Sequence, residues 1–140
     1  MPRGDEMFAV ARQALEAMAL HVPGYKGAVN NSKKFCHGFG IFQYDIQFFL
    51  DDPSYFLEKR WYNFDNCLAV CLKELKAALE SAYGSNKTTL TDKEMVYVAI
   101  AYNTGGVNLA RSFKQGYKDD SGKYYGEYIR DYLKLSQTIE

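Results

Sequence analysis

The sequence predicts an all-α protein that folds as a single domain over residues 1–140. Two long segments, 5–20 and 65–83, repeat apolar residues at helical spacing. A third segment, 95–102, is apolar on nearly every side, as a helix in the middle of a bundle is. Apolar residues make up 47% of the chain and aromatic residues 16%, a composition that excludes a disordered chain. A chain of this length can bury a self-sufficient core.

The first predicted helix spans residues 5–20. Its inner face consists of four apolar residues at helical spacing, namely Phe8, Ala11, Leu15 and Met18. We expect the helix to stop at residues 22–24 (Val-Pro-Gly), because proline disfavours the helical conformation of the residue before it. The following stretch is rich in Gly, Asn, Ser and Lys, so a loop-rich lobe rather than a helix is expected near residues 25–45.

The middle of the chain contains the strongest helical pattern. Residues 52–54 (Asp-Pro-Ser) predict a short turn or helix, and a long helix follows over residues 65–83. Gly84 is expected to end this helix, since glycine is favoured just after a helix C-terminus. The predicted buried stripe advances by four, three, four and three residues, through Leu68, Leu72, Leu75, Leu79 and Ala82.

The C-terminal part of the chain predicts two more helices. Thr91 and Glu94 form a capping box that opens the central buried helix over residues 95–102. Residues 103–106 (Asn-Thr-Gly-Gly) are expected to break this helix sharply. The last helix is predicted over residues 124–135, with an inner stripe of Tyr125, Ile129, Tyr132 and Leu133.

Charge and composition exclude several classes of partner. Seventeen basic and seventeen acidic residues cancel, so the chain lacks the basic surplus with which nucleic-acid-binding proteins hold phosphates. No apolar run approaches the roughly 20 residues that span a bilayer, and no basic amphipathic surface suggests a helix lying on a membrane. No secretion signal is visible at the N-terminus. The cysteines, Cys36, Cys67 and Cys71, are expected to be small buried thiols, although Cys36 could pair with one of the others.

The block from Gly38 to Asp45 (GFGIFQYD) carries residues suited to a sugar-binding groove. Gly38 and Gly40 allow the backbone to approach a bulky sugar, where a Cβ would collide. Gln43 offers a donor and an acceptor to an N-acetyl or hydroxyl group. Tyr44 is a further candidate contact, because tyrosine combines an apolar ring with a polar tip.

A second block, 99–105 (AIAYNTG), ends the predicted central helix. Tyr102 and Asn103 can point a ring and an amide from this helix end toward the same groove. For Gln43 and Asn103 the alternative interpretation is turn chemistry and backbone capping.

These two blocks resemble those of a known enzyme superfamily. The first is similar to the Gly-Phe-Gly-Leu-Met-Gln-x-Asp block of goose-type lysozymes and to the Gly-Leu-Met-Gln block of lytic transglycosylases. The second is similar to the Ala-Tyr-Asn-x-Gly block that follows it in those enzymes. Residues 114–117 (KQGY) and 123–127 (KYYGE) add a resemblance to a bacterial branch of peptidoglycan-binding or muramidase-like proteins. The resemblance implies a lysozyme-like fold and a peptidoglycan substrate, with no metal and no organic cofactor.

One position departs from the family pattern. Enzymes of this superfamily protonate the glycosidic oxygen with a Glu at the end of the helix before the glycine block, usually followed by Ser. Here that place holds His21 and Val22. Three interpretations remain open: Glu16 is the acid in a shifted register, His21 transfers the proton, or the domain binds glycan without cleaving it. Asp45 is the other candidate carboxylate, either ordering a water molecule for hydrolysis or holding a neighbouring backbone in place.

The expected function is therefore binding and cleavage of the β-1,4-linked glycan of bacterial peptidoglycan, as a muramidase or lytic transglycosylase. Such an activity would act on the cell wall, in the periplasm or outside the cell. The alternative is an inactive peptidoglycan-binding module that lacks the catalytic Glu. A helical interaction domain without a carbohydrate role is the third possibility, and it requires both blocks to be coincidental.

Overall fold

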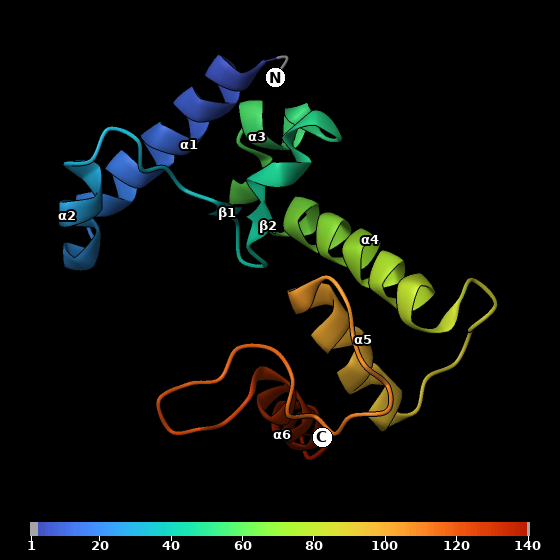
Figure 1. Cartoon of the computed structure of the whole chain (residues 1–140). Helices are drawn as coiled ribbons and strands as arrows, with labels where there is room; N and C mark the ends of the chain where they lie inside the picture. The colour runs from blue at the N-terminus through green and yellow to red at the C-terminus, as the bar shows by residue number, and fades with distance from the viewer. Residues whose placement is uncertain (1–2, 140) are drawn as a thin grey trace. The chain divides into compact units, whose positions relative to one another are not determined.

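The computed structural model describes residues 3–139 and is mostly helical, as the sequence predicts (Figure 1). The α-helices are α1 (Gly4–Ala19), α2 (Lys26–Val29), α3 (Pro53–Leu57), α4 (Phe64–Tyr83), α5 (Asp92–Thr104) and α6 (Tyr125–Ser136). Two short strands, β1 (Gly38–Phe39) and β2 (Tyr44–Asp45), pair as an antiparallel hairpin. The chain divides into two compact units, Met1–Cys71 and Leu72–Glu140, and each is described by itself.

The first unit has an aromatic core. The residues buried in it are Ala11, Phe39, Tyr44, Ile46, Phe49, Tyr55, Phe56 and Val70. Helix α1 begins and ends within one residue of its predicted bounds and buries Ala11 and Leu15, as predicted. Phe8 was expected on the inner face as well, but it lies at the edge of α1, exposed and in edge contact with Phe35.

The loop-rich lobe near residues 25–45 is more regular than predicted. It contains a 3₁₀ turn (Pro23–Tyr25), helix α2 and the β1–β2 hairpin. A four-residue helix and two-residue strands are too short to show a hydrophobic period, so sequence spacing could not reveal them. The hairpin pairs Gly38 with Asp45 and Phe39 with Tyr44.

The second unit is built around α5, which is the predicted central buried helix. Its capping box is present, with the Thr91 main-chain N–H donating to Glu94 Oε2 at 2.8 Å. Its buried residues are Val96, Tyr97, Val98, Ile100 and Ala101. Helix α6 packs closely on α5 at Gly126, where a Cβ would lie 2.5 Å from Ile100 Cδ1.

Two predicted buried stripes need correction. On α4 the most buried residues are Cys67, Val70, Cys71 and Ala78, whereas Leu72 of the predicted leucine stripe is 55% exposed. Apolar residues cover more than one side of α4, so spacing alone could not decide which side is buried. On α6, Tyr125, Ile129 and Leu133 pack inward as predicted, but Tyr132 is 63% exposed.

All three cysteines are free thiols. Cys67 and Cys71 are buried, as expected, and the Cys67 Sγ donates to the Trp61 carbonyl at 3.1 Å. Cys36 is half-buried, and its thiol donates to the Gly38 carbonyl. Within residues 3–139, no helix is long and apolar enough to cross a membrane.

Candidate functional site

Glu16 lies on the exposed side of α1, one turn after Arg12. Its Oε1 accepts a hydrogen bond from Arg12 Nε at 2.8 Å, and about half of its side-chain surface is exposed. The other guanidinium N–H groups of Arg12 donate to the carbonyl oxygens of Val29, Asn31 and Lys34. The Arg12–Glu16 pair therefore joins α1 to the segment that leads into the hairpin.

His21 lies in the turn that follows α1 and is exposed. Its main-chain N–H donates to the Met18 carbonyl at 3.0 Å, so the residue takes part in the end of the helix through its backbone. The described contacts place neither Glu16 nor His21 in a buried pocket.

The first motif forms the β1–β2 hairpin and its turn. Gly40 and Gln43, at the two ends of the turn, both have a left-handed backbone, with φ of 76° and 55°. The Gln43 main-chain N–H and its side-chain Nε2 both donate to the Gly40 carbonyl, at 3.1 and 2.9 Å. The side chain of Gln43 thus serves the turn chemistry that was its alternative interpretation, while it remains exposed at the hairpin tip.

The two glycines of the hairpin make room for the protein's own side chains. A Cβ on Gly40 would lie 2.6 Å from Cys67 Sγ and 2.8 Å from the Tyr55 hydroxyl oxygen, which are buried. A Cβ on Gly38 would lie 2.6 Å from Gln43 Oε1. The space beside both missing Cβ atoms is therefore occupied by the protein's own side chains, which is a packing reason for glycine at these two positions.

Tyr44 and Asp45 have structural contacts in the hairpin. Tyr44 is only 3% exposed, and its ring stacks on those of Phe48 and Phe56. Asp45 caps the 3₁₀ helix Ile46–Leu50, and its Oδ1 accepts a hydrogen bond from the Gln47 main-chain N–H at 2.8 Å. Asp45 thus holds a neighbouring backbone in place, one of the two roles that the sequence left open.

The second motif lies at the C-terminal end of α5, in the second unit. Gly105 ends the helix in a left-handed conformation, and the Thr104 hydroxyl donates back to the Ile100 carbonyl. Tyr102 is half-buried against the apolar cluster around Ala78, whereas Asn103 is exposed. The helix end predicted from the motif is therefore confirmed.

An exposed aromatic cluster beside the hairpin turn was not predicted. We define the aromatic cluster as Phe42, Trp61, Tyr62 and Phe64. The Phe42 and Phe64 rings lie 6.1 Å apart, and those of Trp61 and Tyr62 lie 5.6 Å apart. Tyr62 is 78% exposed and Phe64 is 56% exposed.

The aromatic cluster is anchored to the β1–β2 hairpin through Trp61. The Trp61 ring packs on Phe39 of β1 at 4.9 Å, and the Trp61 Cβ lies close to Gly40. These contacts bring the turn of the hairpin against the segment that precedes α4. The signal in the sequence is the run Arg-Trp-Tyr-Asn-Phe at residues 60–64, which contains the chain's single Trp.

A buried amide in the second unit was also missed. Gln115 is the buried polar residue of the Lys-Gln-Gly-Tyr segment. Its Oε1 accepts from the Asn108 N–H, and its Nε2 donates to the carbonyl oxygens of Asn108 and Ser112. These three hydrogen bonds tie Gln115 to the main chain of Asn108 and Ser112 and so hold the loop 108–115 together. Gln115 therefore has a structural role.

The described residues, 3–139, contain no group of three or more His, Cys, Asp or Glu side chains that could hold a metal ion. The chain was compared with protein-family models, curated proteins and solved structures, and none of them matches it.

Proposed function

We propose that this chain is a lysozyme-like, glycan-binding protein whose ligand is a β-1,4-linked, N-acetylated glycan of the peptidoglycan type. The observation that carries the proposal is the aromatic cluster, which lies beside the very hairpin that resembles the lysozyme and lytic-transglycosylase block. Exposed aromatic rings in a group are unusual on a protein surface and mark a site of binding.

Ring stacking is the chemistry that this surface offers. A pyranose ring with equatorial substituents has an apolar C–H face that packs on an aromatic ring, whose face is negatively polarised. Tyr62 and Phe64 present such rings to solvent, and Trp61 and Phe42 hold them in place. Tyrosine and phenylalanine lose few rotatable bonds on binding, so the entropic cost of the contact is low.

Polar groups beside the rings would orient the sugar. Gln43 lies at the tip of the hairpin with its amide exposed, and its Nε2 has a second N–H beyond the one that bonds Gly40. An N-acetyl group carries one donor and one acceptor, so it matches a primary amide of this kind.

The geometry favours binding over cleavage. Glycosidic cleavage needs a carboxylic acid that can donate a proton to the leaving oxygen. In this structure the Glu16 carboxylate is paired with Arg12, and the Asp45 carboxylate caps a helix. Both candidates therefore have structural partners, and we propose a binding module as the form of the function.

A pelleting assay tests the proposal. The purified protein would be incubated with insoluble peptidoglycan, and the soluble and pelleted fractions compared. The wild type is expected to pellet, and Tyr62→Ala and Phe64→Ala are each expected to weaken binding by about tenfold, since a stacked aromatic ring is a typical binding hot spot. Tyr132→Ala, which removes an equally exposed ring from α6, is the matched control and should pellet as the wild type does.

Failure of the wild type to pellet, or equal weakening by the control, would contradict the proposed site. Mass spectrometry of the soluble fraction tests the absence of cleavage. Reducing-end muropeptides would reveal a muramidase and anhydro-ended ones a transglycosylase. In either case Glu16→Gln and His21→Ala would identify the proton donor.

A further inference from the structure

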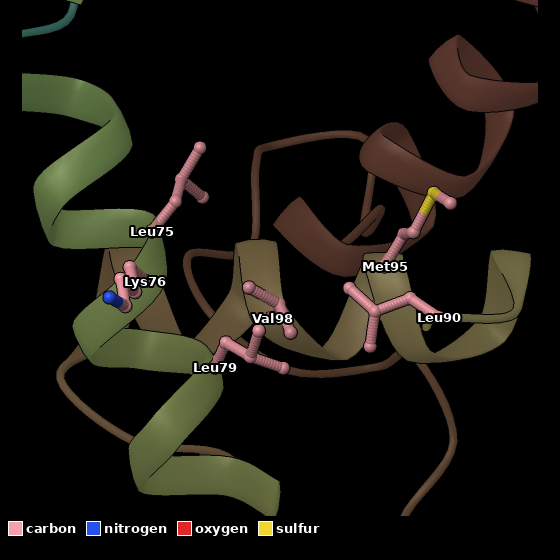
Figure 2. Close-up of a pocket in the computed structure, with 6 residues that line it drawn as sticks. All are labelled: Leu75, Lys76, Leu79, Leu90, Met95 and Val98. Atoms are coloured by element: carbon pink, nitrogen blue, oxygen red, sulfur yellow. The ribbon is translucent and has the colours of Figure 1, made fainter. Parts of the chain in front are cut away.

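An apolar groove lies in the second unit between α4 and α5 (Figure 2). Leu75 and Leu79 of α4 line one side, and Leu90, Met95 and Val98 line the other. The groove has a volume of about 330 Å³. Apart from a lysine at its edge its lining is aliphatic, so the groove suits apolar side chains rather than a sugar.

Leu72, one helical turn before the groove residue Leu75, is exposed to solvent. Leu72 precedes Leu75 and Leu79 at the spacing of a helical stripe, and it is 55% exposed. Cys71 and Ala78 are the residues of this part of α4 that the fold buries, and Leu75 and Leu79 pack against Ala78 while they line the groove. The exposed leucine and the groove together form a continuous apolar surface along one helix, which is the pattern of a helix-pairing face.

The charges that flank this face change sign along α4. Lys73 and Lys76 come first, and Glu80 follows one turn later, all three exposed. In an antiparallel pair of identical helices, the basic part of each helix lies beside the acidic part of the other. A parallel pair would instead bring like charges together. In the antiparallel orientation Lys73 of one helix thus comes close to Glu80 of the other on both sides of the two-fold axis, while Lys76 lies near the axis itself.

We propose that a second copy of this chain docks on this face, forming an antiparallel, two-fold symmetric dimer through α4. Each residue of such an interface contacts its counterpart reciprocally. Leu72 of each copy lies opposite Leu79 of the other, and the leucine stripe of each helix fills the groove of its partner. Lys73 of each copy pairs with Glu80 of the other. The dimer is independent of the aromatic cluster, none of whose residues line the groove.

Sedimentation equilibrium over a dilution series tests the dimer. The wild type is expected to show twice the 16.0 kDa mass of one chain, with dissociation on dilution. Leu72→Glu places a charge in the apolar face and is expected to weaken dimerisation by at least about tenfold. Leu135→Glu is the matched control, because Leu135 is an equally exposed leucine of α6 outside the groove, and it should leave the dimer intact.

A charge exchange tests the orientation without altering the apolar face. Lys73→Glu and Glu80→Lys are each expected to weaken the dimer by about tenfold through like-charge contacts. The double variant restores opposite charges across the interface and should recover the wild-type dissociation constant. A monomeric wild type, or a double variant as weak as the sum of the single ones, would overturn the proposal.

Discussion

Arg12 and Glu16 form an ion pair one turn apart on α1, with 2.8 Å between Arg12 Nε and Glu16 Oε1. The same guanidinium donates to the main-chain oxygens of Val29, Asn31 and Lys34. One planar group therefore fastens the end of α2 and the segment after it to α1. Glu16 orients the guanidinium through this ion pair, so its carboxylate has a structural role here.

Arg12→Lys is expected to destabilise the protein by about 1–3 kcal/mol, because an ammonium group cannot reproduce the fork of the guanidinium and leaves carbonyl groups without a donor. Thermal or urea denaturation measures the change. Arg60→Lys is the control, since Arg60 pairs with Glu58 on the surface and its replacement should cost less than about 1 kcal/mol. Equal effects of the two substitutions would contradict the structural role of Arg12.

Asp45 is expected to act as a helix cap. Asp45→Ala removes the acceptor for the Gln47 N–H and should cost about 1 kcal/mol of stability, whereas Asp45→Asn keeps an oxygen acceptor and should cost little. Under the proposed function, both variants should bind peptidoglycan as strongly as the wild type. If Asp45 were instead a catalytic carboxylate, the wild type would release soluble muropeptides and both variants would fail to do so, so stability and product formation measured together separate the two roles.

Gly40 is expected to tolerate no side chain. Gly40→Ala combines a left-handed backbone with a Cβ 2.6 Å from Cys67 Sγ, and it should destabilise the protein by about 2–4 kcal/mol. Gly84→Ala is the control, because Gly84 has a similar φ of 83° but no atom near its absent Cβ, so only about 1 kcal/mol is expected. The difference between the two melting temperatures measures the packing contribution at Gly40.

Glu94 is expected to make the second unit acid-sensitive. Its hydrogen bond from Lys87 Nζ, together with the bond from the Thr91 main-chain N–H, lowers the pKa of Glu94 from 4.5 to about 2. A carboxyl group whose pKa is lower in the folded state contributes stability that is complete above pH 4.5 and is lost as the pH falls toward 2.

Melting temperatures recorded between neutral and acidic pH check this expectation. The wild type should lose more stability over that acidic range than Glu94→Gln, whose side chain does not titrate. Lys87→Met should reduce the dependence, since it removes the largest cause of the lowered pKa. An identical pH profile for the wild type and Glu94→Gln would contradict the prediction.

The sequence alone determined the features that depend on local chemistry. Thr91 and Glu94 predict the start of α5, and Pro53 predicts the short helix α3, because caps and prolines act on backbone groups only a few residues away. The turn chemistry of Gln43 and the capping by Asp45 were also among the interpretations that the sequence allowed. Their bonds reach residues two or three positions away, within the range that sequence spacing describes.

The tertiary structure alone decided which side of α4 is buried and where the aromatic cluster forms. Leu72 and Cys71 are neighbours on an apolar helix, yet one is exposed and the other buried. That choice depends on which elements pack against α4 and how closely they approach, and these contacts come from residues far away in the chain. The aromatic cluster is likewise a product of long-range packing, because Trp61 rests on β1, more than twenty residues earlier. Local propensity thus sets where the helices begin and end, whereas long-range packing sets which of their faces stay exposed and can contact a ligand or partner.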